Sequence, residues 1–229
     1  MSPRPVIALQ AVIVAAVPLL LVGNMLWLLV TPAFVHAQYA LPGIPVPVAN
    51  LGASGQERLG LIGVEAVHPA GIGVAALEEA RLDNGRPAFT RRELRHMSDV
   101  RTVVKGAFWA WGIALLAGAA AIVVLWRRRR REAVRRALAR GAELTLAATL
   151  LLGLGMAVSF DAVFEGFHGA LFADGTWRFP DDSTLITLYP DAFWTLAGAA
   201  AAVLIVVQAA AVRAVMRTSE AVGASRAGG

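Results

Sequence analysis

The chain has 229 residues, of which 57% are hydrophobic and 16% are charged. A soluble domain carries about 25% charged residues, so this composition is not that of an ordinary soluble protein. The absence of cysteine excludes disulfides, thiolate catalysis and cysteine-ligated zinc. A net charge of +5 would suit a nucleic-acid-binding protein, but the positions of the positive charges favour another explanation.

The apolar residues fall into four long uncharged runs, at residues 5–30, 106–126, 144–160 and 192–212. A helix needs about 20 mostly apolar residues to cross the hydrocarbon core of a bilayer, and an isolated strand would leave its backbone unpaired there. We therefore expect an all-α membrane protein with four transmembrane helices. Asn24 and Gln208 lie within these runs, where they line a cavity or tie two helices together by a hydrogen bond.

The first apolar run, at residues 5–30, is also open to another interpretation. Val35, His36 and Ala37 resemble a signal-peptidase site, but a signal peptide has an apolar region of about 7–15 residues, and this run is longer. We expect an uncleaved anchor helix.

The charges orient these helices. Residues 127–140 contain eight arginines, whereas residues 161–191 contain six acids and one arginine. By the positive-inside rule, the arginine-rich loop and both termini are cytoplasmic, and its partner is the anionic lipid leaflet rather than nucleic acid. We expect a multi-pass plasma-membrane protein. The expected transmembrane segments are about 6–30, 103–126, 141–160 and 192–214, with outer segments at 31–102 and 161–191, a cytoplasmic loop at 127–140 and a cytoplasmic tail at 215–229.

The small extracytoplasmic region between the first two transmembrane helices begins with four prolines between residues 32 and 47. These prolines favour extended or turn structure there. Residues 74–82 are expected to form a short helix. Thr90 and Glu93 fit a capping box, which predicts a helix that starts there and continues into the second transmembrane helix.

The outer loop at 161–191 begins with an amphipathic interfacial segment. Phe160, Phe164, Phe167 and Phe172 recur near helical spacing, which predicts that the third transmembrane helix continues into the interface. A belt of aromatic residues at one depth follows, made of Trp177, Phe179, Tyr189, Phe193 and Trp194.

Two histidines stand out because each has a glutamate three residues before it: Glu93 precedes His96, and Glu165 precedes His168. A carboxylate one helical turn away can fix the tautomer of the ring and raise its basicity. The alternative is two surface histidines with chance neighbours. A di-metal site is disfavoured, because the first and fourth apolar runs contain no Asp or Glu to complete it. We expect no metal and no cofactor.

Two blocks of residues resemble a family signature. The first is Phe89-Thr90-x-x-Glu93-x-x-His96-Met97-x-Asp99-Val100, and the second is Phe167-His168-x-x-Leu171-Phe172-x-x-Gly175-x-Trp177-x-Phe179, continued by Leu185-Ile186-x-Leu188-Tyr189-Pro190-x-x-Phe193-Trp194. With these blocks the chain resembles the bacterial four-helix membrane proteins that include the lipoprotein intramolecular transacylase. Residues 31–88 match no motif of the family.

The resemblance implies an acyltransferase whose substrate is a diacylated lipoprotein in a lipid membrane. The sn-2 acyl chain moves from the glycerol to the α-amino group of the N-terminal cysteine of the lipoprotein and leaves a lyso-form. The two signature histidines of the family match His96 and His168. We expect one to act as a base, and the oxyanion donor to be the second histidine, Arg95 or the Trp177 indole. Glu93, Asp99 and Glu165 are supporting candidates.

Two other functions compete with this one. The first is a non-enzymatic membrane scaffold or accessory subunit, and the second is a small transporter, which the few polar residues in the apolar runs disfavour. A scaffold or a transporter does not require His96 and His168 to lie close together. The enzyme hypothesis requires the two histidines to lie within about 15 Å of each other, because they share one site. No feature of the sequence assigns an oligomeric state, and a monomer is compatible with it.

Overall fold

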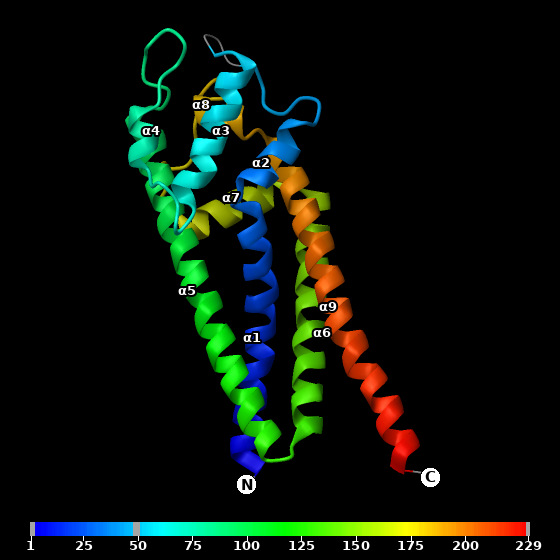
Figure 1. Ribbon diagram of the computed structural model, residues 1–229. Helices are drawn as coiled ribbons and strands as arrows, with labels where there is room; N and C mark the ends of the chain where they lie inside the picture. The colour runs from blue at the N-terminus through cyan, green and yellow to red at the C-terminus, as the bar shows by residue number, and fades with distance from the viewer. Residues whose placement is uncertain (1–2, 48–50, 228–229) are drawn as a thin grey trace. The chain divides into compact units, whose positions relative to one another are not determined.

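The structure, a computed structural model, describes residues 3–47 and 51–227 of the chain. These residues form helices and no β-strand (Figure 1). The helices are α1 (Pro3–Leu29), α2 (Pro32–Tyr39), α3 (Ala53–Val67), α4 (Ala75–Glu79), α5 (Arg91–Arg127), α6 (Arg131–Val158), α7 (Phe160–Leu171), α8 (Thr184–Leu188) and α9 (Asp191–Ala227). The all-α prediction is confirmed.

Four of these helices, α1, α5, α6 and α9, are long and apolar enough to cross a membrane, as expected from the four apolar runs. The predicted helix from Thr90 and the second apolar run form one continuous helix, α5. α6 begins at Arg131, so much of the expected loop at 127–140 is helical. Arginine, alanine and glutamate make up most of this stretch, and all three have high helix propensity.

The chain packs as two compact units. The first unit consists of Met1–Met25, Trp109–Leu154 and Ala201–Gly229, and the second consists of Leu26–Phe108 and Gly155–Ala200. The first unit therefore contains most of the apolar length of the long helices. The second contains the short helices α2, α3, α4, α7 and α8, together with all four histidines.

Small side chains bring the helices of the first unit together. Ile13, Leu125 and Ala209 are buried in its core. At Gly141 a Cβ atom would lie only 2.7 Å from the Cβ of Val17, so glycine is needed where α6 approaches α1.

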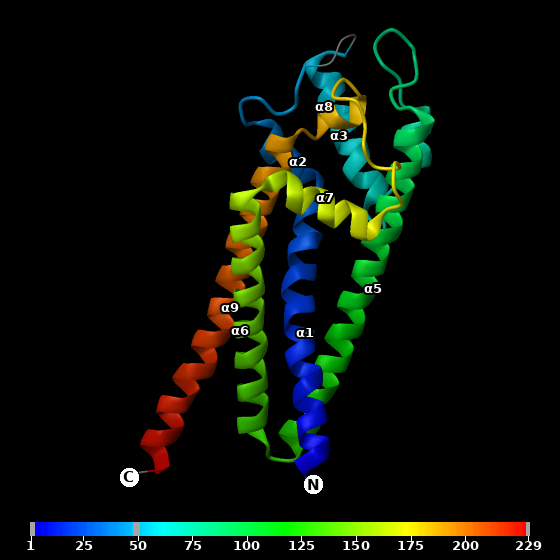
Figure 2. The same ribbon diagram turned by 180° about the vertical axis from the view of Figure 1, so that it is seen from behind.

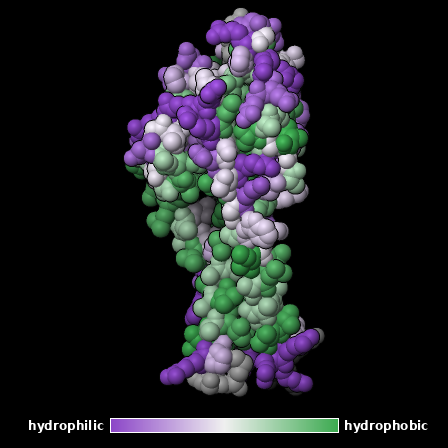
Figure 3. Space-filling view, turned by 90° about the vertical axis from the view of Figure 1, so that its left-hand side faces the viewer, coloured by the Kyte–Doolittle hydropathy of each residue, from purple (hydrophilic) through white to green (hydrophobic). Residues whose placement is uncertain are grey.

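The outer surface of the first unit is apolar. Leu150 remains 73% exposed, which suits a surface that faces lipid. On the face shown in Figure 3, hydrophobic side chains cover this unit and hydrophilic ones gather at its end.

Polar side chains inside the first unit join three helices. The Asn24 amide nitrogen donates to Gln208 Oε1 at 3.0 Å, and Trp111 Nε1 donates to Asn24 Oδ1 at 3.1 Å. Of the two alternatives for Asn24 and Gln208, the structure therefore supports the hydrogen bond between helices.

The core of the second unit joins α3 to the segment that precedes α9. Leu59 and Leu188 are fully buried in it. Two tyrosine hydroxyls cross this interface: Tyr189 donates to the Gly60 carbonyl at 2.6 Å, and Tyr39 donates to the Leu188 carbonyl at 2.9 Å. These bonds attach the region between α1 and α5 to the last part of the chain.

The expectation of extended or turn structure after the first apolar run was wrong for residues 32–39, which form α2. Thr31 caps α2 by accepting from the Phe34 amide at 3.3 Å, and Pro32 occupies the first helical turn, where a proline needs no N–H partner. α3 contains three glycines that lower its helix propensity. Packing overrides that propensity, because two of them, Gly60 and Gly63, make room for the tyrosine rings.

The third transmembrane helix does not continue into the interface as expected. α6 ends at Val158, Ser159 is extended, and its side chain caps a separate helix, α7, by accepting from the Ala162 amide at 3.3 Å. The chain turns sharply here, and α7 runs from the end of α6 across to α5 (Figure 2). This turn places His168 near the start of α5.

Candidate functional site

The first turns of α5 carry one half of the site. Thr90 and Glu93 form the predicted capping box: the Thr90 amide donates to Glu93 Oε2 at 2.7 Å, and the Glu93 amide donates to Thr90 Oγ1 at 3.3 Å. The other carboxylate oxygen of Glu93 accepts from the Leu185 amide at 2.9 Å. Glu93 is 1% exposed, and both of its oxygens accept from groups other than the His96 ring. The expectation that it fixes the His96 tautomer is therefore not supported.

His96 lies one turn further along α5, buried among aromatic rings. Only 7% of its surface is exposed. Its ring centroid lies 5.0 Å from that of Phe172 and 5.5 Å from that of Phe179. Its Nδ1 atom is buried and has no hydrogen-bond partner within residues 3–47 and 51–227. A buried polar atom without a partner costs free energy, so this nitrogen marks a place where a polar group can bind.

The second half of the site is His168 on α7. Its Nδ1 lies 2.8 Å from the Phe164 carbonyl oxygen, which can only accept, so Nδ1 carries the proton and Nε2 keeps its lone pair in the neutral ring. Burial lowers the pKa of the His168 imidazole below its usual value of 6.5, and the bond to Phe164 opposes that change. The expected partner, Glu165, instead forms an ion pair with Arg178 at 3.1 Å.

The two histidines meet, as the hypothesis of a shared site requires. Their ring centroids are 6.3 Å apart, and the ring planes differ by 26°. This separation is well inside the 15 Å limit set from the sequence. A positive charge on either ring would repel a charge on the other, so the arrangement favours two neutral imidazoles.

Trp177 closes the site on the side of His168. Its ring centroid lies 4.9 Å from that of His168, and 8% of its surface is exposed. Its indole Nε1–H is buried without a hydrogen-bond partner in the part of the chain that the structure describes. The site therefore holds one unpaired donor, at Trp177, and one unpaired ring nitrogen, at His96.

The remaining candidates are less central. Arg95 and Asp99 are exposed on α5, and neither side chain makes a hydrogen bond or ion pair with the other described residues. Against the larger lowering by burial, the negative charge of Asp99 acts to raise the pKa of His96. The expected aromatic belt is two clusters: Trp177 and Phe179 contact the histidines, whereas Tyr189, Phe193 and Trp194 contact one another. Within the described residues, no three His, Asp or Glu side chains converge as metal ligands.

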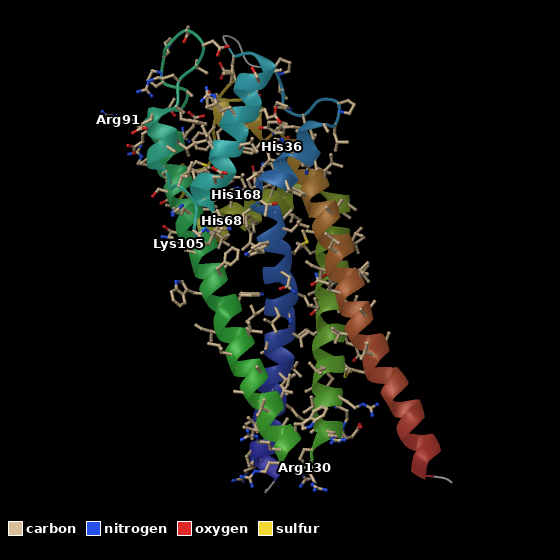
Figure 4. All side chains as sticks on the ribbon, viewed as in Figure 1. His36, His68, Arg91, Lys105, Arg130 and His168 are labelled. Atoms are coloured by element: carbon tan, nitrogen blue, oxygen red, sulfur yellow. The ribbon has the colours of Figure 1, made fainter. Side chains whose placement is uncertain are left out.

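The other two histidines belong to other contacts in the same unit (Figure 4). His36 Nδ1 lies 2.7 Å from Glu57 Oε1 and links α2 to α3. His68 follows α3, and its Nδ1 accepts from the Ala70 amide at 3.2 Å.

Arg92 also contacts the site, although no sequence motif points to it. Its Nη2 donates to the carbonyl oxygen of Gly175 at 2.7 Å and to that of Arg178, and its guanidinium lies 5.2 Å from the centroid of the Phe179 ring. In the sequence Arg92 is one of two adjacent arginines in the first turn of a helix, and nothing there separates its role from that of Arg91.

The fold and the site define a multi-pass α-helical membrane protein with two histidines packed against each other in an aromatic enclosure. Residues 75–194 match the family model described as lipoprotein intramolecular transacylase Lit. The chain belongs to this family. It is also similar to an uncharacterized protein of Aquifex aeolicus (strain VF5), with 29% identity over 166 residues that cover 70% of this chain and 71% of the relative.

Solved structures of the lipoprotein intramolecular transacylase Lit from Bacillus cereus share the fold. One aligns with a TM-score of 0.79 at 16% identity and covers 94% of this chain and 95% of that one. A variant of the same protein with one histidine replaced by arginine aligns with a TM-score of 0.74 at 16% identity, and covers 99% of this chain and 96% of that one. These likenesses support the four-helix membrane fold.

Proposed function

We propose that this protein transfers an acyl chain within one diacylglyceryl lipoprotein. Membership of the family supports lipoprotein intramolecular transacylase activity. In the proposed reaction the α-amine of the N-terminal cysteine attacks the sn-2 ester carbonyl of the same molecule. The C–N bond forms, the bond from the carbonyl carbon to the glycerol oxygen breaks, and the product is an N-acyl, S-monoacylglyceryl lyso-lipoprotein.

The observation that carries the proposal is the pair formed by the buried His96 and the half-buried His168, with an unpaired nitrogen on one side and an unpaired indole donor on the other. His168 Nε2 takes a proton from the attacking amine, because its Nδ1 is committed to the Phe164 carbonyl. The Trp177 indole donates to the oxyanion that develops on the carbonyl oxygen. His168 then gives the proton to the departing glycerol oxygen. The same imidazole therefore acts first as base and then as acid, and its protonation state is unchanged at the end of the reaction.

In this scheme His96 is not the base; it positions and stabilises the reacting groups beside His168. It is held rigidly on α5 between Phe172 and Phe179, and its ring faces His168. The amine and the ester already belong to one molecule, so proximity supplies a large part of the rate, and no protein nucleophile is required. The ester becomes an amide, so no nucleotide or other energy source is needed.

The test is replacement of each histidine by alanine, followed by mass spectrometry of lipopeptides from a host that makes diacylated lipoproteins. We expect His96→Ala and His168→Ala to lower lyso-lipoprotein formation by roughly 10²–10⁴-fold. His68→Ala is the matched control, because His68 lies in the same unit and binds a backbone amide outside the site. Full activity in both site variants would overturn the proposal and favour a non-enzymatic scaffold or accessory role.

We also propose that the site faces outward and that both termini are cytoplasmic. The eight arginines of residues 127–140 support this orientation by the positive-inside rule. The chain has no cysteine, so single cysteines can be labelled without background. With a membrane-impermeant maleimide on intact cells, we expect Asp174→Cys to react and Arg128→Cys to react only after lysis. The reverse pattern would contradict the orientation.

A further inference from the structure

The aromatic walls of the site stand on a segment with little regular structure. Residues 172–183, between α7 and α8, carry Phe172, Trp177 and Phe179, three of the rings that pack on the histidines. Phe164 and Phe167, which also contact His168, lie on α7 itself. Gly175 in this segment has a φ of +76° and allows the turn that returns the chain toward α5. Such a segment needs contacts outside itself to keep its side chains in fixed places.

Arg92 supplies these contacts at the middle of the segment. Its Nη2 donates to the carbonyl oxygens of Gly175 and Arg178, which lie on both sides of Trp177. The flat guanidinium also lies over the Phe179 ring, with 5.2 Å from Cζ to the centroid. A guanidinium can donate to two carbonyls and stack on a ring at once, which a lysine ammonium cannot do with the same geometry.

Glu93 holds the far end of the segment. Its buried carboxylate accepts from the Leu185 amide at 2.9 Å, in the first turn of α8, and its second oxygen accepts from the Thr90 amide at 2.7 Å. Glu93 therefore ties the start of α8 to the start of α5. His96 lies one turn beyond Glu93 on the same helix, α5. The segment and His96 are therefore both attached to α5, which fixes their positions relative to each other.

We propose that Arg92 and Glu93 are positioning residues that hold residues 172–185 so that Trp177 and Phe179 remain against His168 and His96. This inference rests on the proposed function for its catalytic consequence. Neither residue contacts a reacting group in the proposed scheme. They act through the aromatic enclosure, where a displacement of about 1 Å can lower the rate by roughly 10²-fold.

Arg101 provides a matched control for Arg92. It also lies on α5 in the second unit and donates to backbone carbonyls, among them those of Ala66 and His68. Its carbonyl partners lie at the end of α3 and in the loop after it, and not in the segment after α7. Arg92→Gln and Arg101→Gln therefore remove the same kind of interaction from two different loops.

The experiment measures two properties of the purified full-length variants. The first is kcat on a diacylglyceryl lipopeptide in mixed micelles. The second is the indole ¹⁵N–¹H resonance of Trp177, identified among the six tryptophans by its absence in Trp177→Phe. We expect Arg92→Gln to lower kcat by roughly tenfold or more, with little change in KM, and to shift the Trp177 resonance. Arg101→Gln should leave the resonance unchanged and kcat within about twofold of the wild-type value.

An unmoved Trp177 resonance in Arg92→Gln, or an equal loss of kcat in Arg101→Gln, would overturn the proposal. If Arg92→Gln does not fold, Arg92→Lys gives the second measurement, and an unshifted resonance there would have the same meaning. Glu93→Gln tests the other attachment. The glutamine side chain has only one acceptor oxygen, so its NH₂ group faces one of the two backbone N–H groups that donate to Glu93, and that hydrogen bond is lost. We therefore expect the Trp177 resonance to shift in this variant as well. The resonance is measured without substrate, so it tests the positioning even if the wild-type protein shows no transacylation.

Discussion

The rings of His96 and His168 lie face to face, with centroids 6.3 Å apart and planes 26° from parallel. One ring is held on the rigid first turns of α5, and the other on the separate helix α7. Their contact depends on the turn at Ser159, because a straight continuation of α6 would carry His168 away from α5. The pairing is therefore a product of the tertiary fold and leads directly to predictions for the reaction.

The first prediction concerns the coupling of the two histidines. Because both act on one reacting centre, the double variant His96→Ala/His168→Ala should lose about as much kcat as the worse single variant, and not the product of both losses. Single-turnover rates for the four proteins of this cycle measure the coupling. Losses that multiply would contradict a shared site and indicate two independent contributions.

The second prediction concerns pH. Burial lowers the pKa of His168, so its folded-state ring becomes protonated only at a pH below the usual value of 6.5. The neutral ring is the active base, so the contribution of His168 to kcat should stay level as the pH falls to about 6.5 and decline only below it. The profile is measured at saturating lipopeptide, where kcat reports the bound complex. The α-amino group of the substrate has an ordinary pKa of about 7.7–8.0 and gives its own acid limb. A second acid limb centred between this value and about 6.5 would contradict the assignment of His168 as base.

The third prediction concerns the unpaired indole of Trp177. Phenylalanine keeps most of the buried ring but removes the Nε1–H donor, so Trp177→Phe should lower kcat by roughly 10²-fold or more. Loss of the donor itself should not lower the free energy of unfolding, because the donor has no partner in the described residues of the folded protein. The smaller phenyl ring should cost about 1 kcal/mol of stability through lost packing.

Trp194→Phe is the control for Trp177→Phe, since Trp194 lies in the same unit, is 43% exposed and contacts the other aromatic cluster. Its kcat should remain within about twofold of the wild-type value. If Trp177→Phe keeps full kcat, the indole is not the oxyanion donor.

The fourth prediction concerns the glycines of α3. A Cβ atom on Gly63 would lie 2.2 Å from the hydroxyl oxygen of Tyr189, which is buried and donates to the Gly60 carbonyl. Gly63→Ala should therefore destabilise the protein by about 1–3 kcal/mol, measured as the thermal unfolding of the purified protein in detergent. At Gly106 on α5 no atom lies within 4 Å of such a Cβ, so Gly106→Ala should be neutral or stabilise by about 0.5–1 kcal/mol. Equal effects of the two substitutions would contradict the close packing at Gly63.

Local patterns in the sequence predicted several features correctly. The capping box of Thr90 and Glu93 depends on residues three apart and appears in the structure with both reciprocal bonds. The short helix expected at 74–82 is present as α4, Ala75–Glu79. Both features involve neighbours in the chain, so spacing is sufficient to identify them.

The partners of the glutamates could not be predicted in the same way. Three-residue spacing predicts Glu165 as the partner of His168, yet Glu165 pairs with Arg178, and a backbone carbonyl orients the ring. Glu93 likewise reaches Leu185, far along the chain. A helical neighbour is only one of several competing partners, and the path of the intervening loop decides which of them comes within reach.

Four apolar helices follow from the sequence alone, because uncharged runs of this length are stable as helices in a bilayer. The motifs also pointed to His96 and His168. Their proximity depends on the fold: the break at Ser159 turns α7 toward α5, and Arg92 and Glu93 bind the backbone at Gly175 and Leu185. The physical reason is that membrane insertion depends on the hydrophobicity of continuous segments, whereas the site depends on hydrogen bonds between residues distant in the chain.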